Sequence, residues 1–141
     1  MISIQKNSTN LVVLELTPTA PPGETYFIFE LIWESDTTNY KRYFTTLNLS
    51  LAKDRYDCFI WTEDDFGSQD QIVDNEAIFL NPGQYRVNVY STFLPPDPNN
   101  LWPYIIEPIQ THRMVVFGSS LEVDPVYDST FVNPYQPSVY D

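Results

Sequence analysis

Apolar and polar residues alternate with a period of two along much of this chain, and two segments show the alternation most clearly. One face of residues 26–33 carries Phe27, Phe29, Leu31 and Trp33, while Tyr85, Val87 and Val89 alternate with Arg86, Asn88 and Tyr90. A period of two is the spacing of side chains along one face of a β-strand. Shorter patterns of this kind predict further strands at 3–6, 10–16, 41–47, 56–62, 76–80 and 113–117.

Composition supports an all-β chain. The chain has ten Tyr, nine Phe and many Thr, Val and Ile but only three Ala, so residues that favour strands outnumber residues that favour helices. About eight short strands separated by Pro, Gly, Asn and Asp are typical of a sandwich or barrel. A chain of 141 residues can form one self-sufficient domain.

The segment 80–89, Leu-Asn-Pro-Gly-Gln-Tyr-Arg-Val-Asn-Val, narrows the fold. It resembles the corner of fibronectin type III and other immunoglobulin-like domains, where one strand ends and the next begins with an inward tyrosine. The resemblance implies a Greek-key, immunoglobulin-like β-sandwich in which the Tyr85 hydroxyl bonds a backbone group a few residues upstream. The chain is longer than a fibronectin type III domain. We assign the sandwich to residues 1–123.

Residues 124–141 have the composition of an extended arm. From Pro125 onward there is no Lys, Arg or Gly, and Pro125, Pro134 and Pro137 exclude a helix or a central strand. Aromatic residues, which make good anchors in grooves of other proteins, recur along the arm at Tyr127, Phe131, Tyr135 and Tyr140. The arm therefore docks on another chain or packs on its own domain.

Three connections between strands differ in character. Residues 17–24 have the turn chemistry of a crossing between strands. Residues 63–75 read as an acidic loop, either solvated or holding Ca²⁺, although the spacing is not that of an EF-hand. Residues 94–108 contain five Pro and form the longest irregular loop. Within that loop, Trp102 and Tyr104 are the predicted contacts with another molecule.

Charge and side-chain chemistry exclude several classes of function. A net charge of −12 with seven scattered Lys and Arg argues against nucleic acid and anionic membranes, and it suits a basic partner. His112 is the only imidazole, and we interpret it as a surface histidine at a strand end. Cys58 is interpreted as a small buried hydrophobic residue. These two residues provide neither a catalytic triad nor a metal site, so we expect no enzyme activity and no cofactor.

The exposed aromatics leave one alternative to a structural role. Trp61, Trp102 and Tyr104 are candidates for a flat stacking platform, as in carbohydrate-binding modules. Trp33 lies on the alternating hydrophobic face of its strand and is expected in the core.

The pattern of the whole chain is similar to small β-rich virion structural proteins of tailed bacteriophages, in particular the crAss-like group. This resemblance is carried by three segments: residues 1–16 at the start, Asp54-Arg55-Tyr56-Asp57 before one strand, and Pro82-Gly83-Gln84-Tyr85 before another. It covers residues 1–117 and not the arm. It implies a non-enzymatic subunit of the neck, the head-tail connector or the capsid surface, made in the host cytoplasm and repeated as a ring with other virion proteins. The absence of a signal-peptide core or a long apolar run agrees with that expectation.

Overall fold

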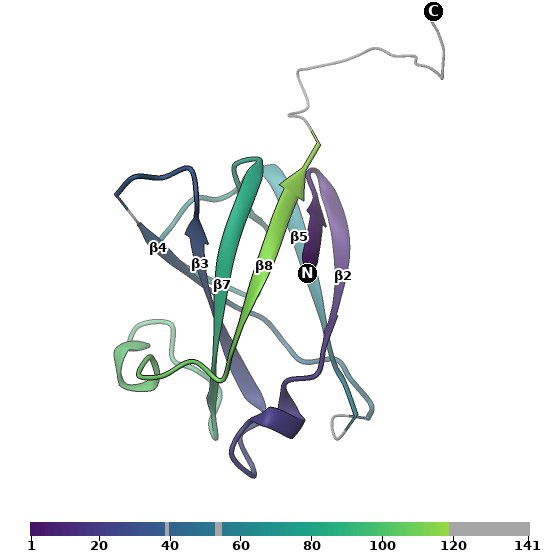
Figure 1. The fold of residues 1–141 in the computed structure, drawn as a ribbon, viewed down its shortest axis with the longest axis vertical. Coiled ribbons are helices and arrows are strands. Elements are labelled where there is room, and N and C mark those ends of the chain that lie inside the picture. The colour runs from purple at the N-terminus through teal and green to yellow at the C-terminus, as the bar shows by residue number, and fades with distance from the viewer. Residues whose placement is uncertain (39, 53–54, 119–141) are drawn as a thin grey trace, which may run out of the picture.

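The computed structural model describes residues 1–38, 40–52 and 55–118, and this part of the chain forms an all-β sandwich (Figure 1). The only helical segments in these ranges are two three-residue 3-10 turns, η1 (Thr17–Thr19) and η2 (Trp102–Tyr104). No helix in the described ranges has the length and apolar character needed to cross a bilayer. The strands are β1 (Ile2–Gln5), β2 (Ser8–Leu14), β3 (Tyr26–Trp33), β4 (Lys41–Thr45), β5 (Asp57–Ser68), β6 (Ile72–Asp74), β7 (Gly83–Thr92) and β8 (Gln110–Phe117).

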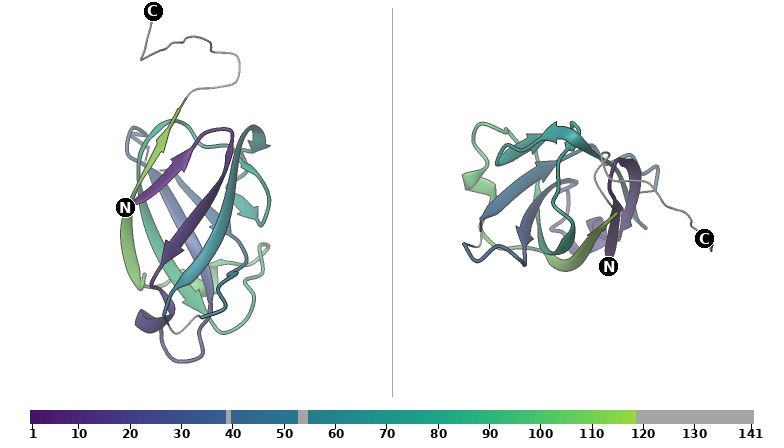
Figure 2. Two further views of the ribbon diagram at one scale, coloured as in Figure 1. Left: turned by 90° about the vertical axis from the view of Figure 1, so that its right-hand side faces the viewer. Right: turned by 90° about the horizontal axis from the view of Figure 1, so that it is seen from above.

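Two sheets of unequal width face each other, as the side and top views show (Figure 2). The wide sheet has the order β1-β8-β7-β3-β4-β6, and the narrow one pairs β2 with β5. The β1–β8 and β4–β6 pairs are parallel, whereas the other pairs are antiparallel. The run β3-β7-β8 opposite β2–β5 corresponds to strands C, F and G opposite B and E in the immunoglobulin fold.

Aromatic side chains from both sheets fill the space between them. The Trp61 ring of β5 is fully buried and meets Phe29 and Phe44 edge-on, with centroids 5.1 and 4.9 Å apart. Phe59, also on β5, meets Phe29 in the same way at 5.1 Å. Edge-to-face pairs at this separation stabilise a core beyond the area that they bury. The alternating face predicted for Tyr26–Trp33 is the wall of this core, and Trp33 packs against it partly buried.

Asp57 fastens the start of β5 to the crossing between the sheets. Its side chain accepts hydrogen bonds from the backbone N–H groups of Leu16 and Thr17, at 2.8 and 2.7 Å, and from the Thr17 hydroxyl and the Asn48 amide, both at 2.6 Å. Because four donors surround it, the carboxylate can be fully buried. The crossing predicted at residues 17–24 is therefore confirmed, since the chain passes there from β2 in one sheet to β3 in the other.

The predicted acidic loop 63–75 is wrong. Strand β5 runs through its first half to Ser68, and β6 occupies Ile72–Asp74. Inward and outward positions still alternate, with Glu63 buried and Asp64 half-exposed, so the acidic residues are accommodated within a strand. Gly67 allows another segment to approach closely, because a Cβ there would lie 2.7 Å from the carbonyl carbon of Ile78.

The predicted strand 76–80 is also wrong. Among the described residues, Ile78 forms two isolated bridges, to Glu63 and Ser68 of β5, and the neighbouring Ala77 and Phe79 hydrogen-bond to the Ser68 backbone. The segment follows the edge of β5 without forming a strand of its own. The predicted boundary between residues 123 and 124, and the arm with Tyr127, Phe131, Tyr135 and Tyr140, lie outside the described residues.

Candidate functional site

Residues 93–109 fold back over the outer face of the wide sheet and create a second, smaller apolar layer. Leu101 is inserted against Ile28 of β3, Tyr43 of β4 and Tyr90 of β7, and all four residues are buried. Strand β3 is consequently buried on both faces, which requires apolar residues at positions that an exposed strand would give to polar ones. The loop that sequence reasoning singled out is thus anchored to the sandwich (Figure 1).

The 3-10 turn η2 presents the predicted contact residues differently. The Trp102 ring meets the Tyr43 ring edge-on, with centroids 5.5 Å apart, yet 57% of the tryptophan remains exposed. Tyr104 is half-buried and packs against the apolar layer. Pro103 favours the turn, since its fixed φ suits the first helical positions.

A groove of about 440 Å³ lies where the two ends of this loop meet. Phe93, Leu94 and Ile106 line it with exposed fractions of 60, 65 and 82%. Within the described part of the chain, its charged lining residues are Glu24 and Glu107, both acidic. We call the three apolar residues and Trp102, which is exposed on the same loop, the loop surface. It is apolar with an acidic border.

A buried carboxylate lies on the same face of the sheet. Glu30 is 1% exposed and accepts hydrogen bonds from the Asn88 amide at 2.8 Å and the Tyr90 hydroxyl at 3.3 Å. Lys41 Nζ lies 4.0 Å from its other oxygen. Burial is the main cause that raises the pKa of Tyr90 to about 12, and the negative charge of Glu30 is the second. The same two causes raise the pKa of Tyr43 more than that of Tyr90. Both phenols stay protonated at neutral pH and can donate hydrogen bonds.

The hydrogen bond expected of the tyrosine corner is present. The Tyr85 hydroxyl donates to the Asn81 carbonyl at 2.9 Å, and its ring stacks on Trp33 with centroids 6.4 Å apart. Burial raises the pKa of Tyr85 to about 12. Gly83, with a φ of 133°, makes room for Trp33, since a Cβ there would lie 2.8 Å from the indole nitrogen.

Other predicted site residues lie elsewhere. The prediction that Trp61 is an exposed platform residue is wrong, because its ring is completely buried between the sheets. Cys58 is half-buried, because it takes an outward position on β5 opposite Val13. His112 lies within β8, half-buried, with Nε2 2.6 Å from Gln110 Oε1. Burial, and then the N-terminal ammonium, lower the pKa of His112.

Acidic and thiol ligands do not gather into a metal centre in the described part of the chain. No group of three or more His, Cys, Asp and Glu residues there has the arrangement of a metal site. Trp102 and Tyr104 remain as neighbouring aromatics of the loop, without the third platform member.

Sequence reasoning missed a second exposed apolar surface, on the outer face of the narrow sheet. Leu11 and Val13 of β2 and Ile60 of β5 are 66, 52 and 43% exposed, and Leu11 pairs directly with Ile60. The sequence feature that indicates this surface is the unbroken run Leu11-Val12-Val13-Leu14, which places apolar residues on both faces of its strand.

Comparison of the chain with family models, curated proteins and solved structures finds no match.

Proposed function

We propose that this chain is a non-enzymatic structural subunit of a bacteriophage virion. It repeats in the neck, the head-tail connector or the capsid surface and assembles through the loop surface and the arm 124–141. The resemblance of residues 1–117 to small β-rich virion proteins supports the setting. The observation that carries the assembly role is the loop surface itself.

The loop surface has the composition of an interface core rather than of ordinary protein surface. Four large apolar side chains from one loop are more than half exposed, and three of them line a common groove. Scattered single apolar residues are normal on a protein surface, whereas a contiguous group bordered by polar residues marks a contact with another protein. Tryptophan in particular is enriched among residues that dominate interface energies.

The charge around the groove indicates the kind of partner. Glu24 and Glu107 border it, and the whole chain carries a net charge of −12. A partner that inserts an apolar side chain and places Lys or Arg at the rim is complementary in both respects. We infer that this partner is a neighbouring virion protein, either another copy of this chain or a more basic protein.

Light scattering after size exclusion, at several concentrations, tests the assembly role. The full chain is compared with a version that ends at Asp124 and with the double variant Leu94→Ser/Ile106→Ser. We expect the full chain to form oligomers, and we expect both altered versions to dissociate toward monomers at concentrations where the full chain stays assembled.

Leu51→Ser is the matched control, because Leu51 is fully exposed outside the loop surface. It should leave the distribution of oligomers unchanged. A full chain that stays monomeric at every concentration contradicts self-assembly. Equal dissociation in the control contradicts a specific role for the loop surface.

A further inference from the structure

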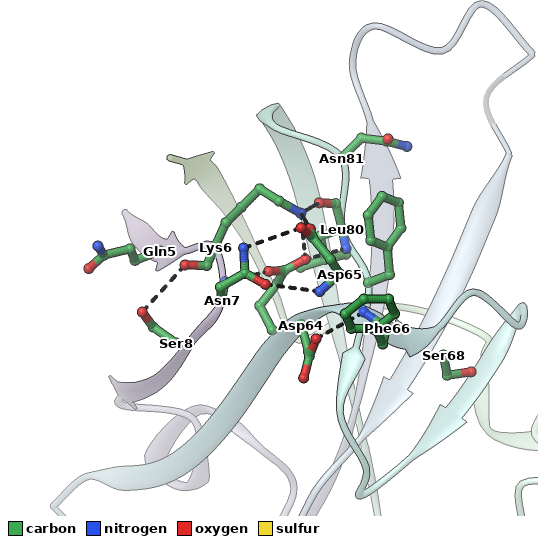
Figure 3. Close-up of polar contacts among 12 residues, drawn as sticks. Gln5, Lys6, Asn7, Ser8, Asp64, Asp65, Phe66, Ser68, Leu80 and Asn81 are labelled. Carbon is green, nitrogen blue, oxygen red and sulfur yellow. Dashed lines mark hydrogen bonds and ion pairs between the residues drawn. The ribbon is translucent and has the colours of Figure 1, made fainter. Parts of the chain in front are cut away.

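Three charged side chains converge inside the sandwich, at the end where β1 turns into β2 (Figure 3). Lys6 follows β1, whereas Glu63 and Asp65 come from β5. The side chains of Lys6 and Glu63 are 0% exposed, and that of Asp65 is 11% exposed. Lysine and glutamate are almost never fully buried unless they are paired. The cluster therefore combines one amine with two carboxylates away from water.

The amine is held in one position. Lys6 Nζ lies 2.8 Å from Glu63 Oε2 and 3.2 Å from Asp65 Oδ1, and it donates a hydrogen bond of 2.8 Å to the Leu80 carbonyl. It also lies 4.4 Å from the centroid of the Phe79 ring. A lysine side chain normally has four free torsions, so contacts on this many sides remove the conformational freedom that opposes a reaction.

Both carboxylates are oriented by groups other than the lysine. Glu63 accepts hydrogen bonds from the backbone N–H of Asn7 at 2.8 Å and of Leu80 at 2.9 Å. The Asp65 backbone N–H donates to Asn7 Oδ1 at 3.0 Å, and Asn7 Nδ2 lies 3.4 Å from Asp65 Oδ2. Asn7 can contact both carboxylates, Glu63 through its backbone N–H and Asp65 through its side-chain amide, because its backbone is left-handed. Its φ of 56° is a conformation that asparagine tolerates.

A simple ion pair accounts for Lys6 and Glu63 but not for the second carboxylate. Asp65 adds a second carboxylate beside the amine in a region where burying charge is costly. An amide-forming reaction needs three components. They are an amine, a carboxyl group within contact distance, and a second carboxylate beside the amine. We propose that Lys6 and Asp65 condense to an intramolecular isopeptide bond, with Glu63 as the proton relay.

The atoms of this step balance without any further reactant. The Lys6 ammonium gives a proton to Glu63 Oε2, and the neutral amine attacks Asp65 Cγ to form the new C–N bond. One Asp65 carboxyl oxygen then leaves as water, taking the proton returned by Glu63 and a second proton from the nitrogen. The C–O bond breaks, Glu63 ends ionised as it began, and one ammonium and one carboxylate become one amide and one water.

The surroundings favour condensation over the reverse reaction. Reacting groups held about 3 Å apart in a fixed orientation gain the large effective concentrations typical of intramolecular reactions. The site is buried, so bulk water does not compete for the acyl carbon. A surface depression of about 280 Å³, lined by Asn7, Thr62 and Glu63, lies beside the cluster.

Intact mass spectrometry of the purified full chain tests the proposal directly. We expect a mass lower than that of the sequence by one water molecule. After digestion, the peptide that contains Lys6 should be covalently joined to the one that contains Asp65. A mass equal to that of the sequence overturns the proposal, whatever the variants do. A water loss without the joined peptides, as cyclisation of an aspartate would give, also overturns it.

Two variants and a control then assign the roles. Lys6→Arg and Glu63→Gln should restore the full mass, while Lys41→Arg should keep the water loss because Lys41 is half-exposed and belongs to a different carboxylate. Glu63→Gln retains the shape of the side chain, and amide NMR spectra verify its fold. A joined peptide in Glu63→Gln overturns the relay role. The joined protein should also melt at a higher temperature than the variants.

Discussion

Tyr85 places a phenol hydroxyl at the margin of the core and satisfies it with one acceptor, the Asn81 carbonyl. Tyr85→Phe removes that hydrogen bond, so we expect a loss of about 1 kcal/mol or more in the free energy of unfolding. Urea denaturation of both proteins measures it. Tyr56→Phe is the control, because Tyr56 is 38% exposed. An unchanged midpoint for Tyr85→Phe contradicts the stabilising role of the corner.

Alkaline pH should destabilise the folded chain through buried tyrosines. The pKa values of Tyr85 and Tyr90 are raised from 10.0 to about 12, chiefly by burial. Between these values the unfolded chain has lost protons that the folded chain still binds, so the free energy of unfolding falls as pH rises. Stability from these groups is complete below about pH 10 and is lost toward about pH 12.

Urea midpoints across that range measure the pH dependence. The double variant Tyr85→Phe/Tyr90→Phe should lose less stability with rising pH than the unaltered chain, whereas Tyr56→Phe should follow the unaltered chain. If the double variant shows the full alkaline decline, Tyr85 and Tyr90 are not its cause.

Strands are the elements that the sequence predicts best here, and the reason is alternation. The β3 bounds agree with the prediction at both ends, because its inward face repeats an aromatic or aliphatic residue at every second position. The sequence pattern predicts that this strand ends at residue 62, whereas β5 continues to Ser68. The acidic composition of residues 63–75 indicates a loop. In the structure, Glu63 can be buried within a strand because it pairs with Lys6 and accepts a hydrogen bond from the Asn7 backbone N–H.

The sites depended on tertiary contacts, which a local pattern does not contain. Trp61 and Trp102 each follow an aliphatic residue in the sequence, yet one is fully buried and the other is more than half exposed. The difference comes from β5 facing the wide sheet, while η2 lies outside it. The Lys6 cluster was missed for the same reason, since its members lie almost sixty positions apart.

The loop 93–109 depends on Leu101 for its attachment to the wide sheet. Leu101→Ala removes most of a side chain that is 1% exposed, and buried leucine truncations typically cost about 2–5 kcal/mol. We expect the cost to fall on the attachment of the loop more than on the sandwich. In hydrogen exchange, amides of residues 101–106 should lose protection while those of β7 keep most of theirs.

Leu94→Ala is the matched control for this experiment, because the Leu94 side chain is 65% exposed. It should leave exchange at residues 101–106 unchanged. A uniform loss of protection across β3, β7 and the loop in Leu101→Ala means instead that the loop and the sandwich unfold together.

At the scale of the whole molecule, the two sheets differ in how much surface they leave for partners. The wide sheet is covered on one face by the narrow sheet and partly on the other by the loop. The narrow sheet keeps an outer face with Leu11, Val13 and Ile60 exposed. The loop surface covers the wide sheet and this outer face belongs to the narrow sheet, so the proposed virion subunit would have two separate surfaces for contacts with neighbours.

The parallel pairing of β1 with β8 determines how the molecule carries mechanical load. Ile2 to Gln5 pair in register with Met114 to Phe117, and the Lys6 N–H donates to the Phe117 carbonyl at 2.9 Å. Tension applied between residue 1 and the chain beyond Gly118 pulls these parallel strands in opposite directions. The hydrogen bonds between them are then sheared together rather than broken one at a time, so the sandwich resists extension applied between these two strand ends.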